Sequence, residues 1–217
     1  GPFQRDRPSG LALDAAGDVY VAGSSYDNAQ AWDMATVKYR GADGEPVWER
    51  RYDLGVGGID EAYAIAVGGP GRVAVTGTSY TDALDGRLRD VLTLVYDTGG
   101  DLLWLDRHDG PAGLQDGGQD VAIGPDGAVA VVGETTGRND DIDYLTLRYD
   151  AQGETVWGRL YDGGRGESDF GQHVAIDALG RTLVTGQARR DAGQTDLVTV
   201  AYGPIGEELW YAVHATE

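Results

Sequence analysis

The sequence predicts an all-β protein: a β-propeller built from four-stranded antiparallel sheets, or blades. Three observations support this prediction. One ordered set of landmarks occurs four times, short β-branched runs alternate with glycine and aspartate turns, and no stretch shows helical periodicity. The 217 residues include 35 glycines, as expected for many short strands joined by tight turns. Units of about 40–50 residues in series, each with four strands, are typical of propellers.

Each copy is marked by a tryptophan with a glycine four residues before it. The tryptophans follow one another at intervals of 56, 53 and 53 residues, at Trp48, Trp104, Trp157 and Trp210. Upstream lies an Asp-x-x-Thr-x-x-Tyr motif, such as Asp33-Thr36-Tyr39, and before it a β-branched run closed by glycine. We therefore predict one propeller domain, residues 6–217, with four repeats at 6–59, 60–115, 116–168 and 169–217. Residues 1–5 are expected to be a linker or the remnant of a cleaved tag.

Within each copy the pattern predicts four strands in a meander. A short apolar strand, such as Ala64 to Val67, is followed by a glycine turn and the second strand. A variable connection leads to the third strand, and a glycine turn leads to the fourth, which carries the tryptophan. The connections are expected at Ser24 to Trp32, Thr78 to Arg89, Glu134 to Ile142 and Gln187 to Thr195. Both faces of the third strand, for instance at residues 144–149, are partly apolar, as expected for blades that are packed on both sides.

The number of blades in the complete ring is open at this point. Four repeats fit a closed four-bladed ring, an arc of a larger propeller, or a half that self-associates into eight blades. Because the pattern begins with a first strand and ends after a fourth, no blade has to be shared between the two ends. We therefore expect face-to-face packing of blades rather than strand exchange.

The repeat resembles a known bacterial family. Residues 33–39, Asp-Met-Ala-Thr-Val-Lys-Tyr, are followed by Gly44 and Trp48, while Ala12-Leu13-Asp14 is followed by Gly17 and by residues 19–23, Val-Tyr-Val-Ala-Gly. This order is similar to that of the SBBP-type β-propeller repeats, and the similarity extends from Asp6 over nearly the whole chain. The resemblance implies a propeller in a bacterial protein and favours a secreted or cell-surface location, with the cytoplasm as the alternative. It implies no particular activity, because a fold does not fix a function.

Composition excludes some classes of partner. With 17 basic and 36 acidic residues, the net charge is −19, which argues against nucleic acid and against anionic membrane surfaces. No apolar run approaches the ~18 residues of a membrane span, so membrane insertion is not expected. The absence of cysteine excludes disulfides and thiolate zinc sites.

Candidate binding residues lie on the variable connections, because positions that recur in every copy most simply serve the scaffold. Variable loops on a rigid scaffold are where recognition usually resides. These connections are rich in aromatic residues and arginine, the usual composition of binding hot spots. The candidates are Tyr26, Trp32, Tyr80, Arg87, Arg89, Arg138, Arg189 and Arg190. The alternative is a set of solvated loops without a partner.

Two polar constellations invite other interpretations. Each repeat opens with an aspartate, at Asp6, Asp60, Asp116 and Asp169. Four equivalent carboxylates around an axis could bind a hard cation such as Ca²⁺, while the alternative is that each aspartate caps its own turn. Asp120 and His173 start the first strands of adjacent repeats and are expected at the rim of the central channel. A carboxylate that orients an imidazole is half of a general-base arrangement, but no nucleophile or oxyanion hole accompanies it, and a chance polar pair is favoured.

The sequence therefore favours a non-enzymatic binding module that presents a loop face to a protein, peptide or glycan, as part of a larger bacterial protein. The alternatives are a hydrolase or lyase that uses Asp120 and His173, and a purely architectural repeat domain. No cofactor other than calcium is expected. Self-association that completes a larger ring is a further expectation.

Overall fold

The computed structural model describes residues 5–26, 31–55, 58–80, 88–137, 141–163, 167–189 and 194–215. These residues form four separate four-stranded sheets. The first two sheets contain β1 (Asp6–Leu13), β2 (Val19–Tyr26), β3 (Trp32–Tyr39) and β4 (Pro46–Tyr52), then β5 (Ile59–Gly68), β6 (Arg72–Tyr80), β7 (Arg89–Asp97) and β8 (Leu102–His108). The other two contain β9 (Asp116–Ile123), β10 (Val129–Thr136), β11 (Ile142–Tyr149) and β12 (Thr155–Tyr161), then β13 (Asp169–Ile176), β14 (Thr182–Arg189), β15 (Thr195–Tyr202) and β16 (Glu208–His214).

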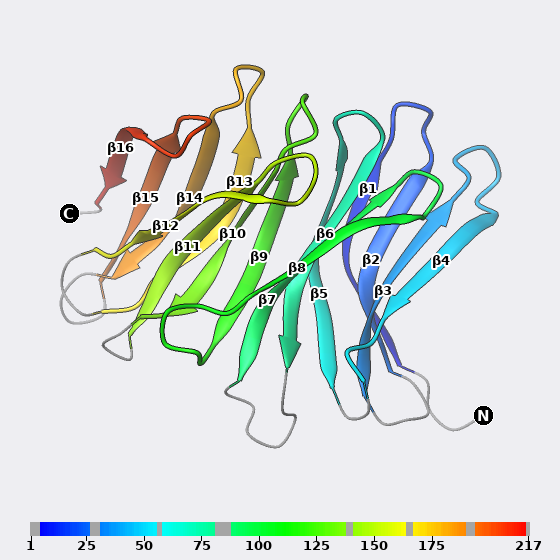
Figure 1. Cartoon of the computed structure of the whole chain (residues 1–217), viewed down its shortest axis with the longest axis horizontal. Helices are drawn as coiled ribbons and strands as arrows, with labels where there is room; N and C mark the ends of the chain where they lie inside the picture. The colour runs from blue at the N-terminus through cyan, green and yellow to red at the C-terminus, as the bar shows by residue number, and fades with distance from the viewer. Residues whose placement is uncertain are drawn as a thin grey trace.

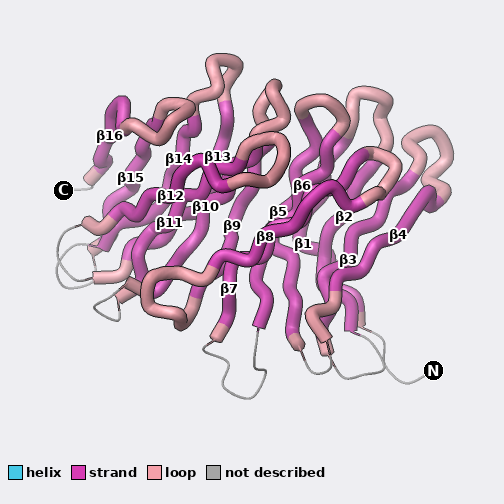
Figure 2. The backbone as a smooth tube through the Cα atoms, in the orientation of Figure 1, coloured by secondary structure: helices cyan, strands magenta, loops and turns pink. Residues whose placement is uncertain are grey.

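Each sheet is an antiparallel meander in chain order, as the repeat predicts. The strands extend further than expected: β5 runs over Ile59–Gly68, and β2 continues to Tyr26, where the sequence suggested a loop from Ser24. Within the described ranges no helix occurs, so none is available to cross a membrane (Figure 2).

A bulge in the first strand explains the glycine that follows the β-branched run inside the second strand. The register of β1 against β2 shifts between Pro8 and Gly10, and the first strands of the other sheets shift at the corresponding place. A Cβ on Gly23 would collide with the carbonyl oxygen of Arg7, and one on Gly77 with that of Glu61. Only glycine leaves room for this close backbone approach, so the residue recurs for a steric reason.

The sheets pack face to face. We call the side of a sheet that faces the next sheet along the chain its forward face, and the opposite side its backward face. Apolar side chains from the forward face of one sheet and the backward face of the next form three buried clusters, one at each junction. At the first junction Tyr20 and Met34 pack with Val75 and Leu94. The two-faced apolar pattern of the third strands is thereby explained.

The recurring tryptophan and glycine meet across each junction. The rings of Trp48, Trp104 and Trp157 lie 6.2, 5.3 and 5.3 Å from those of Tyr96, Tyr149 and Tyr202 in the following sheet. A Cβ added to Gly100, Gly153 or Gly206 would lie only 2.9, 2.7 or 2.6 Å from the same indoles. Trp48 Nε1 also donates a hydrogen bond to the Thr98 carbonyl at 3.0 Å. We call this combination of a tyrosine ring and a turn glycine the tryptophan seat.

The four sheets stand in a row, with the first and the fourth at opposite ends and the chain termini at these two ends (Figure 1). Innermost strands contact one another only along this order, β1 with β5, β5 with β9 and β9 with β13, among the pairs with substantial contact. In the described part of the chain the sheets therefore form an open arc of a propeller, not a closed four-bladed ring.

Candidate functional site

The second strands end and the third strands begin along one edge of the row, which we call the loop rim. Its described strand ends are Tyr26 and Trp32, Tyr80 and Arg89, Thr136 and Ile142, and Arg189 and Thr195. Because all four sheets have the same strand order and direction, these ends share one edge. Arg87, Arg138 and Arg190, three of the predicted binding residues, lie outside the described residues.

An aromatic and cationic cluster occupies the loop rim of the first sheet. The Tyr26 and Trp32 rings pack edge to face with centroids 5.4 Å apart, and the Arg7 guanidinium stacks 4.5 Å from the Trp32 ring centroid. Both rings are partly exposed and Arg7 is exposed. Sequence reasoning singled out Tyr26 and Trp32 but missed Arg7. The position of Arg7 follows from the strand register, because Arg7 pairs with Ser24 on the adjacent strand, two residues before Tyr26.

Arg89 contacts the protein itself. Its Nη2 lies 2.5 Å from Glu134 Oε1 in the third sheet, and its backbone N–H donates to the Leu114 carbonyl at 3.1 Å. Burial alone lowers the pKa of Arg89, but Glu134 and Tyr80 reverse this and hold the pKa above its ordinary value. Arg89 therefore joins the second and third sheets, and a partner would have to displace Glu134 to reach it. Of the other candidates, Tyr80 is partly exposed and Arg189 exposed.

The aspartates that open the repeats bind the backbone of the connection before them. Asp60 accepts a hydrogen bond from the Leu54 amide at 2.9 Å, Asp116 from the Gly110 amide at 2.6 Å and Asp169 from the Gly163 amide at 2.5 Å. All three are buried, whereas Asp6, which starts the first sheet, is exposed and accepts from Ser25 Oγ at 2.6 Å. For Asp60, Asp116 and Asp169 these hydrogen bonds agree with the alternative in which each aspartate caps its own turn. No three of the four carboxylates lie within 4.8 Å of one another, as a shared cation would require.

Carboxylates gather instead at the junctions between sheets. At the second junction, oxygens of Asp90, Asp109 and Asp116 lie within 4.8 Å of one another, the one such acidic group among the described residues. Carboxylate oxygens are the donors that hard cations prefer. However, Arg107 Nη2 lies 2.5 Å from Asp90 Oδ2 and balances part of the charge.

The third junction carries equivalent acids without the arginine. Asp143 and Asp169 correspond to Asp90 and Asp116, whereas Leu160 stands where the second sheet has Arg107. Burial, followed by the charges of Asp141, Asp162 and Asp169, raises the pKa of Asp143 to about 6. The third junction therefore holds a carboxylate that takes up a proton at a pH well above the usual range for aspartate.

The structure brings Asp120 and His173 together, as the sequence predicts for adjacent blades. His173 Nδ1 lies 3.6 Å from Asp120 Oδ2, and the His173 side chain is 76% exposed. Both carboxylate oxygens already accept backbone hydrogen bonds, Oδ2 from Val174 at 3.0 Å and Oδ1 from Val121 at 2.9 Å. Among the described residues no hydroxyl hydrogen-bonds to His173. The contacts of the pair therefore link β9 to β13.

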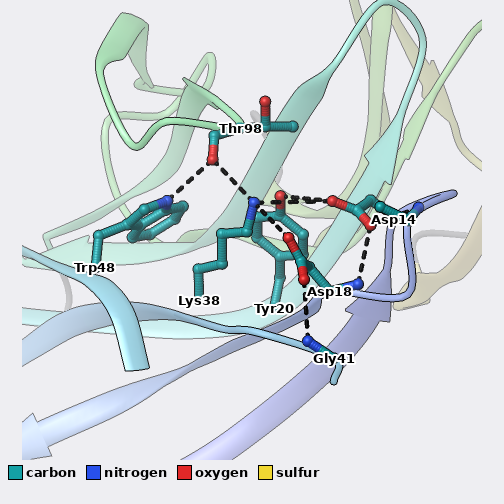
Figure 3. Close-up of polar contacts among 8 residues, drawn as sticks. Asp14, Asp18, Tyr20, Lys38, Gly41, Trp48 and Thr98 are labelled. Atoms are coloured by element: carbon teal, nitrogen blue, oxygen red, sulfur yellow. Dashed lines mark hydrogen bonds and ion pairs between the residues drawn. The ribbon is translucent and has the colours of Figure 1, made fainter. Parts of the chain in front are cut away.

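The single lysine of the chain is buried at the first junction, a role that its sequence position did not reveal (Figure 3). Lys38 Nζ lies 2.9 Å from Asp18 Oδ2 and donates to the Thr98 carbonyl at 3.3 Å, the same oxygen that Trp48 Nε1 reaches. Tyr20 donates from its hydroxyl to Asp14 beside it at 3.0 Å. This network joins the first sheet to the second, and its Asp14 and Asp18 lie at the opposite end of β2 from the loop rim.

Comparisons with known proteins agree on the fold. No family model matches the chain, and no curated protein matches it in sequence. Among solved structures, the chain is similar to quinohemoprotein alcohol dehydrogenase from Comamonas testosteroni (TM-score 0.59, 15% identity, 93% of this chain and 34% of that chain). It is also similar to the β-propeller domain of the Trilobed protease from Pyrococcus furiosus (TM-score 0.55, 10% identity, 97% and 58%). A protein of unknown function from Dyadobacter fermentans is a third (TM-score 0.57, 12% identity, 98% and 73%).

These identities are too low to transfer an activity, so the likeness shows the fold alone. The chain spans about a third of the length of the first of these structures and 58% of the second. The comparisons agree with a β-propeller fold, and the described residues of this chain form four of its blades in an open arc.

Proposed function

We propose that the chain is a non-enzymatic binding module whose loop rim contacts a protein or peptide partner, with Trp32 as the anchor. The observation that supports this proposal is the stacked cluster of Arg7, Trp32 and Tyr26, which is partly exposed where the most variable connections meet the sheet.

The chemistry of the cluster suits recognition. Tryptophan, tyrosine and arginine are the residue types most enriched in binding hot spots. The Trp32 ring is held from one side by Tyr26 and covered by Arg7, so little side-chain entropy is left to lose when a partner binds. The net charge of −19 would favour a basic partner through long-range attraction.

The resemblance to SBBP-type repeats, and the bacterial secreted or cell-surface setting that it implies, are consistent with such a module and are part of the proposal. A hydrolase or lyase built on Asp120 and His173 is the competing hypothesis from another class. The 3.6 Å separation favours it, and the engagement of both Asp120 oxygens by backbone amides weighs against it.

The test uses a displayed peptide library and a glycan array, both probed with the folded protein. We expect selected peptides to lose at least about tenfold in affinity when Trp32 is changed to Ala, as for a hot-spot residue. Trp32→Phe should retain part of the affinity because it keeps an aromatic ring. Tyr211→Ala is the control, because it removes an exposed aromatic ring from β16 that is not among the candidate binding residues.

Circular dichroism melts would verify that each variant is folded. Peptides that bind Trp32→Ala as tightly as the parent would contradict the proposal. Binding to glycans alone, with no peptide selected, would show that the partner is a carbohydrate and not a protein or peptide.

A further inference from the structure

The two ends of the row expose apolar side chains that are buried at every internal junction. On the forward face of the fourth sheet, Leu197 is 52% exposed and Trp210 is 44% exposed. Their counterparts at the first junction, Met34 and Trp48, are 1% and 9% exposed. A hollow of about 290 Å³, lined in part by Leu183 and Thr185, lies on this sheet. The fourth sheet therefore presents the forward half of a junction without a sheet packed on it.

The first sheet presents the opposite half. Leu11 and Leu13 on its backward face are exposed, whereas Ile65 and Val67, which correspond to them in the second sheet, pack against the first buried cluster. A hollow of about 420 Å³ lies on this face, lined by Val21, Val37 and Tyr39 among others.

The backward face of the first sheet also carries a tryptophan seat that no tryptophan of this chain fills. Gly44 occupies the position of Gly100, with a φ of 76°, and no atom lies within 4 Å of a Cβ placed on it. At Gly100 the same Cβ would lie 2.9 Å from the Trp48 indole. Tyr39, the ring of this seat, is partly exposed, while Tyr96 is buried under Trp48.

We propose that copies of this chain associate head to tail, with Trp210 of one copy on the Tyr39 and Gly44 seat of the next. A second copy is the partner because the chain itself carries both halves of the joint, and three junctions within it show that these halves fit. The joint is heterologous, so it closes a ring of two copies or extends into an open series. It uses the end faces of the arc: of the loop-rim cluster, Arg7 also lines the hollow on the first sheet, whereas Tyr26 and the anchor Trp32 do not.

Analytical ultracentrifugation over a range of concentrations up to about 200 µM would detect even a weak joint. We expect species of at least twice the 23.0 kDa chain. A discrete two-chain species means that two joints close a ring, and a concentration-dependent series means that the joints stay open. Both results would support the proposal, because the chains are held together by the proposed joint in each of them.

Two variants each block one half of the joint. Trp210→Arg alters the forward face of the fourth sheet, and Val37→Arg alters the backward face of the first. Each variant alone should sediment as a single chain, whereas an equimolar mixture should regain one joint, because each variant retains the half that the other has lost. Leu103→Arg is the matched control, since Leu103 is similarly exposed but lies on β8 of the second sheet.

Three results would overturn the proposal. The parent could remain a single chain at the highest concentration, which would leave the end faces to a different partner. The mixture of the two variants could fail to associate, which would indicate that the joint does not pair these two faces. Leu103→Arg could dissociate the protein as fully as Trp210→Arg, which would place the contact away from the ends.

Discussion

Trp157 and Trp210 stand at the same position of adjacent repeats, yet only one of them is packed. Trp157 is 5% exposed, packs against the Tyr202 ring with the centroids 5.3 Å apart, and donates from Nε1 to the Pro204 carbonyl at 3.1 Å. Trp210 lies in the equivalent strand and sheet, but no sheet among the described residues packs on it. The difference shows that the repeat residue derives its burial from its neighbour, and that each repeat is incomplete without the next one.

The largest expected effect comes from removing a packed tryptophan. Trp157→Ala should lower the free energy of unfolding by about 3–5 kcal/mol, because it leaves a cavity at the third junction. Trp210→Ala should cost less, about 1–2 kcal/mol, because only its own sheet covers this side chain; it is measured at concentrations where the chain is a monomer. Urea denaturation of both variants tests this, and equal losses would contradict the comparison.

The filled tryptophan seat at Gly153 and the open one at Gly44 should differ in the same sense, by a smaller free energy of unfolding. Gly153→Ala places a Cβ 2.7 Å from the Trp104 ring at a backbone φ of 92°, and should cost about 2–3 kcal/mol. At Gly44 the added Cβ meets no atom, so Gly44→Ala should carry only the left-handed backbone strain of about 1 kcal/mol. Equilibrium urea unfolding separates the two values. A Gly44→Ala loss as large as that of Gly153→Ala would mean that this seat is not open in the monomer.

The second and third junctions differ in charge, and pH should reveal this. The raised pKa of Asp143, about 6, means that its protonated form is favoured in the folded state. The protonated Asp143 side chain makes its full contribution to the free energy of unfolding below the unfolded-state pKa of about 4. This contribution is lost as the pH rises through the folded-state pKa of about 6. Asp143→Asn should therefore stabilise the protein at pH 7.5 by about 1–2 kcal/mol and have little effect near pH 4.

Leu160→Arg is the sharper form of this test, because it gives the third junction the arginine of the second. It should lower the pKa of Asp143, observed by NMR titration of the carboxyl carbon, and reduce the dependence of stability on pH. An unchanged pKa would show that burial alone, rather than the missing arginine, sets the difference between the junctions.

The fold was predictable because the repeat encodes it locally. Alternating apolar residues, turn glycines such as Gly100 and the following Trp104 fix strands and meanders within about 50 residues, and the structure confirms the four-stranded sheets. Strand ends were placed too early at the loop rim, because residues such as Tyr26 pair across the sheet without an apolar signal.

The site was less predictable, because its contacts cross between strands or sheets. Arg89 and Glu134 are 45 residues apart, and nothing near either one indicates the ion pair. Likewise, the stack of Arg7 on Trp32 depends on register rather than on spacing in the sequence. The aspartates that open the repeats recur as a metal ligand would, yet Asp60 and Asp169 bind preceding amides, a choice that recurrence alone does not decide.

The steric requirement at the closing glycines has a consequence for how such chains change over time. Because Gly23 and Gly77 are fixed by the bulge within their own sheet, each repeat carries the conditions for its own folding geometry. Only the junction faces depend on a neighbour. Duplication or deletion of a whole repeat at either end therefore creates or removes a single junction and leaves the other junctions unaltered. The number of blades can thus change by recombination while the structure of each blade stays the same.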